Sequence, residues 1–165
     1  MNVILFGMMG VGKTTVGVKI AELADLRWVD TDLLIEEKYG KITDIFQRHG
    51  EAYFRGLETQ IVKELSAQDG LVLSVGGGLV LNEENRQLLR TNGKMVYLQA
   101  ELQTLIYRLQ LDHTRPLLQG ENLEERLKRL VNERAPMYEK AADYTVSVDK
   151  KTPIEIAQEI LLLIK

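Results

Sequence analysis

The sequence has no cysteine, no long apolar run and no excess of positive charge. Without cysteine the chain can form neither a disulfide nor a thiolate metal site, and it has no cysteine nucleophile. No apolar run approaches the roughly 20 residues that span a bilayer, and the first residues lack the charged leader and cleavage site of a signal peptide. The net charge of −3 gives no basic footprint for nucleic acid. We therefore expect a soluble cytoplasmic protein that binds neither nucleic acid nor membranes, with a monomer as the default state.

The length and composition suit one globular domain. The 165 residues are 45% hydrophobic, which is enough to bury a core. The chain has no internal repeat, no low-complexity tract and no linker. We expect a single domain over residues 1–165, with one polar, proline-containing insertion at 111–122.

Short apolar segments alternate with amphipathic ones along the chain. The apolar segments predict strands at 2–6, 27–30, 71–75, 94–98 and 144–148. Apolar residues at helical spacing predict helices at 13–25, 31–39, 42–48, 51–67, 83–91, 101–110, 123–134 and from 153 onward. Strands that alternate with helices are typical of an α/β fold with a parallel sheet.

The segment GMMGVGKTT at residues 7–15 matches the P-loop pattern G-x-x-x-x-G-K-[ST], between a predicted strand and a predicted helix. Glycine lets the backbone curl so that its N–H groups point at phosphate oxygens, and the helix N-terminus adds further donors. In this arrangement Lys13 reaches the outer phosphates and Thr14 places its hydroxyl on Mg²⁺. The alternative is a glycine-rich turn with a solvated lysine, but the strand–loop–helix context favours a nucleotide phosphate site.

Two aspartates, Asp30 and Asp32, follow the second predicted strand, at the edge where α/β sheets bind ligands. Residues two apart in an extended segment point the same way. Two such carboxylates can divide labour, one near a metal ion and one accepting a hydroxyl proton. The alternative for Asp32 is a helix N-cap, and the residues alone leave both open. The third strand ends at 74–76 without an acid, which makes Asp30 the candidate for the outer shell of the metal.

Three arginines and a glycine turn are candidates for anion binding. Arg55 and Arg134 each present a planar donor fork that matches a carboxylate, although such residues are more often solvated on a helix. The turn Gly76–Gly78 after the third strand can offer backbone N–H groups to a substrate, or can be only a tight turn. Arg115 lies in the polar insertion, where an arginine on a mobile lid can close over phosphates and exclude water.

Taken together, six motifs resemble the shikimate kinase family, small P-loop kinases of the nucleoside-monophosphate-kinase type. In chain order they are GMMGVGKTT, DTD, FRGLE, SVGGG, RPLL and ERAPMYEKAAD, and they span nearly the whole chain. The resemblance implies a three-layer P-loop NTPase fold, with a five-stranded parallel sheet in the order 2-3-1-4-5 flanked by helices. It also implies a mobile lid at about 109–122 and a substrate-binding helical region at about 31–62. The implied activity is transfer of the γ-phosphoryl group of ATP, with Mg²⁺, to the 3-hydroxyl of shikimate in aromatic amino acid biosynthesis.

The same resemblance implies roles for individual residues. The nucleotide phosphates are assigned to Gly10, Val11, Gly12, Lys13, Thr14 and Thr15. Mg²⁺ is assigned to Thr14 and Asp30. Shikimate is assigned to Asp32, Arg55, Gly76, Gly77, Gly78 and Arg134, with the arginines on its carboxylate. The implied catalytic groups are Lys13, Asp32 as base or orienting group, and Arg115 as the lid arginine. Adenine is assigned to Arg108 on one side and to the segment 149–153, which includes Lys151, on the other.

Two other functions stay open at this point. A gluconate kinase shares the P-loop, the small size and a hydroxylated carboxylate substrate, so the arginines alone do not discriminate. The DTD, FRxxE and GGG motifs in combination favour shikimate. A non-catalytic nucleotide-binding regulator would typically have lost Lys13, Asp32 or the lid arginine, and all three are present.

Overall fold

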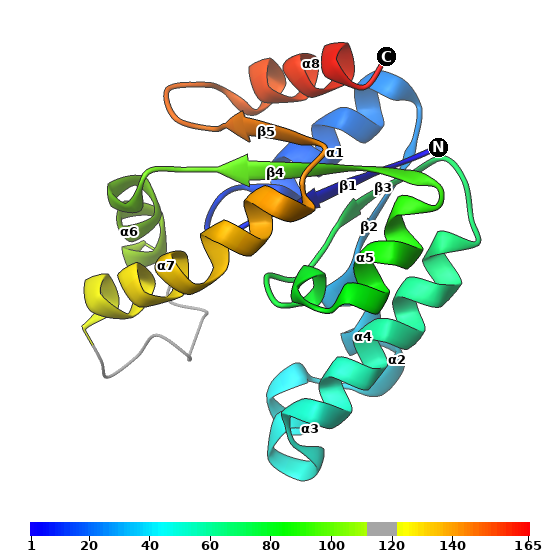
Figure 1. The fold of residues 1–165 in the computed structure, drawn as a ribbon, viewed down its shortest axis with the longest axis vertical. Helices are drawn as coiled ribbons and strands as arrows, with labels where there is room; N and C mark the ends of the chain where they lie inside the picture. Colours follow the sequence, from blue (N-terminus) through cyan, green and yellow to red (C-terminus); the bar gives the residue numbers. More distant parts are fainter. Residues whose placement is uncertain (112–121) are drawn as a thin grey trace.

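The computed structural model describes residues 1–111 and 122–165. At its centre lies a five-stranded parallel sheet in the order β2-β3-β1-β4-β5 (Figure 1). The strands are β1 (Asn2–Phe6), β2 (Arg27–Asp30), β3 (Leu71–Ser74), β4 (Gly93–Gln99) and β5 (Tyr144–Ser147). The predicted fold class and strand order are confirmed.

The central strands are apolar because helices cover both faces of the sheet. All five residues of β1 and all four of β3 are buried. Parallel strands buried on both faces show continuous apolar runs rather than alternation. Right-handed crossovers between parallel strands place the helices in two outer layers. Figure 1 shows one layer formed by α1 (Lys13–Ala24) and α8 (Pro153–Leu163), and the other by α4 (Glu51–Ser66), α5 (Glu83–Arg90) and α7 (Leu123–Ala141).

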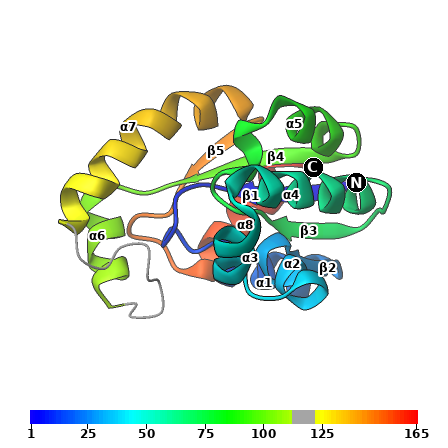
Figure 2. The same ribbon diagram turned by 90° about the horizontal axis from the view of Figure 1, so that it is seen from below.

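A helical region follows the carboxyl end of β2. It comprises α2 (Thr31–Tyr39), α3 (Ile42–His49) and the start of α4. Phe46 of α3 packs on Phe54 of α4 with ring centroids 5.0 Å apart. Figure 2 shows α2, α3 and α4 grouped together, apart from α6 (Leu102–Gln110). A short 3-10 helix, η1 (Leu79–Leu81), which the sequence did not predict, follows the glycine turn.

The helix α7 corrects the prediction that this helix ends at residue 134, because it continues through Pro136 to Ala141. A proline inside a helix removes one backbone hydrogen bond and crowds the preceding turn. Beyond the proline, however, Tyr138 and Ala141 are buried in the core. Burial of these side chains offsets the local cost and keeps the chain helical.

The insertion expected to form a lid at 109–122 lies mostly outside the described residues. Residues 112–121, including Arg115, are not among them, so the lid and its arginine stay predictions. At the start of the expected lid, Leu109 and Gln110 belong to α6 instead, and Leu109 is buried. Within the two described ranges, no helix combines the length and the apolar character needed to cross a membrane.

The carboxyl ends of β1, β2 and β3 meet at one edge of the sheet. Leu5 of β1 pairs with Ser74 of β3, and Ser74 pairs with Asp30 of β2. The segments that continue from these three positions are the phosphate loop, the start of α2 and the glycine turn Gly76–Gly78. The fold therefore brings three segments distant in sequence to the edge where α/β sheets bind ligands.

Candidate active site

The phosphate loop has a backbone that favours glycine at three points. Gly7 has a φ of 151°, Gly10 a φ of 83° and Gly12, the N-cap of α1, a φ of 101°, conformations that other residues rarely adopt. A Cβ on Gly7 would also lie 2.5 Å from the carbonyl oxygen of Leu98. Lys13 is the first residue of α1, and its Nζ donates a hydrogen bond to the carbonyl oxygen of Gly7 at 2.8 Å. The lysine is therefore folded back over the loop that precedes it.

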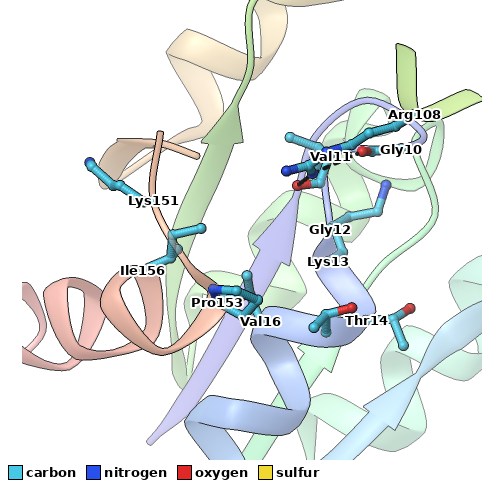
Figure 3. Close-up of a pocket in the computed structure, with 11 residues that line it drawn as sticks. Gly10, Val11, Gly12, Lys13, Thr14, Val16, Arg108, Lys151, Pro153 and Ile156 are labelled. Atoms are coloured by element: carbon cyan, nitrogen blue, oxygen red, sulfur yellow. Dashed lines mark hydrogen bonds between the residues drawn. The ribbon is translucent and has the colours of Figure 1, made fainter. Parts of the chain in front are cut away.

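A cavity of about 400 Å³ opens at this loop (Figure 3). Its lining combines the loop with side chains from α6, α8 and the segment between β5 and α8. The cavity is lined by the described residues predicted to bind the phosphates, by Arg108, and by two residues of the segment 149–153, but not by the other three residues of that segment. The predicted residues that line it are Gly10, Val11, Gly12, Lys13, Thr14, Thr15, Arg108, Lys151 and Pro153. These predicted nucleotide residues thus border one space.

Besides Lys13, two described cations border the cavity from other elements (Figure 3). Arg108 of α6 donates from Nη1 to the carbonyl oxygens of Gly10 at 3.2 Å and Val11 at 3.0 Å. Lys151, before α8, forms an ion pair with Glu159 across 2.8 Å. Arg108 therefore ties α6 to the phosphate loop. The contacts of Arg108 and Lys151 with adenine stay predictions.

Asp30 and Asp32 do not share one extended segment, which corrects the geometry expected from their spacing. β2 ends at Asp30, and Asp32 lies in the first turn of α2. Asp30 is the N-cap of α2, and its Oδ1 accepts a hydrogen bond from the backbone N–H of Leu33 at 3.0 Å. The capping role considered for Asp32 therefore belongs to Asp30.

The glycine turn Gly76–Gly78 packs against three of the side chains predicted to bind the acceptor. A Cβ on its first glycine would lie 2.9 Å from Oδ1 of Asp32. On its second glycine a Cβ would lie 2.8 Å from Nη1 of Arg134, and on its third 2.6 Å from both terminal nitrogens of Arg55. The fold thus gathers residues from α2, α4 and α7 around one backbone turn. Two guanidinium groups at one turn suit an anion such as a carboxylate.

Glu58 of α4 adds a buried carboxylate to this cluster. It is 1% exposed, and its Oε1 accepts a hydrogen bond from Nη1 of Arg55 at 2.7 Å. Burial raises the pKa of Glu58 and the charge of Asp32 adds to this, while Arg55 and Arg134 act in the opposite direction. For Arg55, burial disfavours the charged form, but the bonds and charges of Glu58 and Glu51 outweigh it and raise the pKa. The ion pair holds the guanidinium of Arg55 against the glycine turn.

Tyr138 is a residue of this cluster that sequence reasoning missed. Its buried hydroxyl donates a hydrogen bond to the carbonyl oxygen of Gly77 at 2.5 Å. It follows Arg134 by four residues on α7, so the two side chains share a helix face. This spacing was the available signal, but the prediction that the helix ends at 134 concealed it.

A buried chain of hydrogen bonds holds the start of α1 to the sheet. Ser74, at the end of β3, donates from Oγ to the carbonyl oxygen of Lys13 at 2.8 Å. The Oγ atom of Ser74 in turn accepts a hydrogen bond from Nε1 of Trp28 in β2 at 3.0 Å. No local sequence pattern predicts these hydrogen bonds, because they join β2, β3 and α1 through tertiary contacts.

The fold and the site together define a P-loop kinase, with a phosphate loop after β1 and a separate cluster of Asp32, Arg55 and Arg134 at the same sheet edge. The sequence model of the shikimate kinase family matches residues 9–165, and the chain belongs to this family.

Two similar proteins illustrate the relationship. The chain is 46% identical over 165 residues to a shikimate kinase of Sulfurihydrogenibium sp., with 99% of this chain and 98% of that protein aligned. The structure of shikimate kinase from Acinetobacter baumannii in complex with shikimate has a TM-score of 0.92 and 41% identity, covering 99% of this chain and 92% of that one.

The gluconate kinase alternative is not favoured by the comparisons. A gluconokinase from Sinorhizobium meliloti has a TM-score of 0.57 and 17% identity over 98% of this chain and 89% of that chain. This likeness shows a shared fold alone.

Proposed function

We propose that the protein transfers the γ-phosphoryl group of ATP to the 3-hydroxyl of shikimate, forming shikimate 3-phosphate for aromatic amino acid biosynthesis. The observation that carries the proposal is the cluster of Asp32, Arg55 and Arg134 around Gly76–Gly78, at the same sheet edge as the phosphate loop. Membership of the shikimate kinase family supports it, as does the shikimate in the structure from Acinetobacter baumannii.

The nucleotide half of the site works by positioning and by charge. Phosphoryl transfer needs little covalent help from the protein, so catalysis depends on holding the groups in line and neutralising charge. The loop N–H groups and the N-terminus of α1 bind the phosphates, and Lys13 moves from the Gly7 carbonyl to the outer phosphates. Arg108 and Lys151 flank adenine. Arg115, outside the described residues, closes over the phosphates.

The acceptor half of the site holds shikimate by its carboxylate and hydroxyls. Arg55 and Arg134 bind the carboxylate through their planar donor forks. Asp32 accepts a hydrogen bond from the attacking hydroxyl and orients it, or takes its proton as the hydroxyl oxygen bonds to the γ-phosphorus and the bond from that phosphorus to the departing ADP breaks. Glu58 does not touch the substrate but keeps Arg55 against the glycine turn.

The residues proposed for Mg²⁺ fit a cation that keeps several waters. Mg²⁺ prefers oxygen ligands and is commonly held by one or two protein oxygens plus substrate phosphates. Thr14 lines the nucleotide cavity, and Asp30 caps α2 through Oδ1. The described ranges contain no group of three or more histidine or acidic residues able to hold a metal. Two oxygen donors suit an ion that arrives with ATP. When bound, Mg²⁺ would offset charge on the phosphoryl oxygens.

Two further parts of the proposal concern the protein as a whole. We propose that it acts as a monomer and that it resides in the cytoplasm. Light scattering of the purified protein during chromatography tests the first part, and a single species with the mass of one chain is expected. A mass of two or more chains would overturn it.

The function is tested by ADP release from the purified protein with MgATP and one of three acceptors: shikimate, gluconate or AMP. We expect fast release with shikimate alone. Fast release with gluconate or AMP and none with shikimate would retain the phosphate loop but overturn the acceptor assignment. No release with any acceptor, from folded protein that still binds ATP, would instead indicate a non-catalytic regulator.

A further inference from the structure

The hydroxyl of Tyr138 is a buried polar group at the junction of the acceptor cluster and the core. The side chain is 0% exposed, and the hydroxyl donates to the carbonyl oxygen of Gly77 at 2.5 Å. Buried polar groups are costly unless they are hydrogen-bonded. The bond therefore fixes both the tyrosine and the middle residue of the glycine turn.

Arg134, one helical turn before Tyr138 on α7, also lies next to Gly77. Its Nη1 lies 2.8 Å from the position that a Cβ on Gly77 would occupy, and the Tyr138 hydroxyl lies 3.3 Å from that position. Burial raises the pKa of Tyr138, while the charge of Arg134 and a hydrogen bond with Arg134 oppose this shift. One hydroxyl thus joins the backbone of the glycine turn to an arginine proposed to bind the acceptor.

The ring of Tyr138 connects Gly77 and Arg134 to the strand that leads into the phosphate loop. It packs edge-on against Phe6 with ring centroids 5.6 Å apart, and against Tyr97 at 5.3 Å. Phe6 is the last residue of β1, directly before Gly7, whose carbonyl oxygen accepts the hydrogen bond from Lys13 at 2.8 Å. That same carbonyl oxygen lies 3.7 Å from the Cβ position of Gly77.

We propose that Tyr138 is a positioning residue that fixes the acceptor-binding turn and Arg134 relative to the phosphate loop. Its hydroxyl sets the place of Gly77 and Arg134, and its ring sets the distance of both from β1. Transfer between two bound substrates is sensitive to misplacement of about 1 Å, so a residue that bridges the two halves controls the rate without touching either substrate. The identity of the acceptor in this inference rests on the proposed function.

The test compares Y138F with the matched control Y97F. Each variant removes one hydroxyl from the same aromatic cluster and keeps the ring. The hydroxyl of Tyr97 has no hydrogen bond with any residue in the described part of the chain, whereas that of Tyr138 donates to the carbonyl oxygen of Gly77. For Y138F we expect kcat/KM for shikimate to fall about fivefold to twentyfold, as for a lost buried hydrogen bond, while the KM for ATP changes less than about twofold. For Y97F we expect both constants to stay within about twofold of the wild type. Equal effects of the two variants, or equal effects of Y138F on both substrates, would overturn the proposal.

A second readout does not depend on the substrate. In amide NMR spectra, Y138F should shift the signals of Gly76–Gly78 and leave those of Gly10 and Gly12 in place, and Y97F should move neither set.

The wild type alone gives a further check that does not depend on whether a variant folds. The hydroxyl proton of Tyr138 should exchange slowly and show a nuclear Overhauser effect to Gly77. Fast exchange would overturn the proposal. If the wild type does not phosphorylate shikimate, the proposed function fails, and these spectra still decide the role of Tyr138.

Discussion

The close packing of Gly78 against Arg55 makes G78A a direct test of the acceptor cluster. The added methyl carbon would lie 2.6 Å from both terminal nitrogens of Arg55, about 0.8 Å inside ordinary contact, which begins at 3.4 Å. Gly78 has a φ of −92°, so alanine meets no backbone strain. The guanidinium must therefore move, and a shift of this size breaks its 2.7 Å hydrogen bond to Glu58.

The expected loss of activity in G78A follows from the broken hydrogen bond between Arg55 and Glu58. Hydrogen bonds to charged groups contribute about 1.5–3 kcal/mol. Arg55 is 33% exposed in its side chain, so solvent screening reduces the figure to about 1–2 kcal/mol. The corresponding loss in kcat/KM for shikimate is about 5- to 30-fold. The KM for ATP should change little, because Arg55 does not line the nucleotide cavity.

Gly56 supplies the control for this variant. It neighbours Arg55 on α4, is exposed, and has nothing within 4 Å of its Cβ position. G56A should keep wild-type kinetics and stabilise the fold by about 0.5–1 kcal/mol, since alanine favours a helix interior over glycine. Steady-state kinetics with each substrate varied, together with urea unfolding, measure both variants. Wild-type kcat/KM for shikimate in folded G78A would refute the role given to Arg55 and the glycine turn.

Three further predictions follow from the described contacts. K13M should lower kcat by more than about 1,000-fold, because Lys13 neutralises phosphoryl charge, with thermal unfolding close to wild type; a rate within tenfold of wild type would exclude this role. D32A should lower kcat by about 100-fold or more, measured by ADP release, and a folded D32A enzyme with near-wild-type rate would remove Asp32 from the mechanism. The pKa of Glu58 is raised above its ordinary value of 4.5 by burial, so the folded protein holds this proton more tightly than the unfolded one. The resulting stability is present below pH 4.5 and is lost as the pH rises through the folded pKa. The urea midpoint of the wild type relative to E58Q should therefore fall from pH 4 to pH 8, and a constant or rising difference would contradict the burial argument.

The parts of the fold that local patterns determine were predicted well. The strand–loop–helix of residues 2–24 combines an apolar strand, special glycine geometry and a helix start within one segment. The strand order came from the family resemblance and is confirmed. Convergence of Asp32, Arg55 and Arg134 on one turn also agrees with the grouping that the motifs suggested, although their roles toward substrate stay predictions.

The features that tertiary contacts determine were not predicted. Asp30 and Asp32 were treated as one extended segment, although the predicted helix at 31–39 already contained Asp32, and the structure confirms that helix start. α7 was expected to end at 134, because the burial of Tyr138 that carries it past Pro136 depends on contacts with β1 and β4. The bond from Tyr138 to Gly77 joins residues 61 positions apart, and no sequence period reports such a pair.

Identification of the product is the most decisive experiment for the proposed phosphoryl transfer to shikimate. The wild-type protein would be incubated with MgATP and shikimate, and the mixture followed by ³¹P and ¹H NMR. We expect one phosphate monoester on the 3-oxygen of shikimate for each ADP formed. ADP with free phosphate, or an unchanged mixture from folded protein that binds ATP, would contradict it.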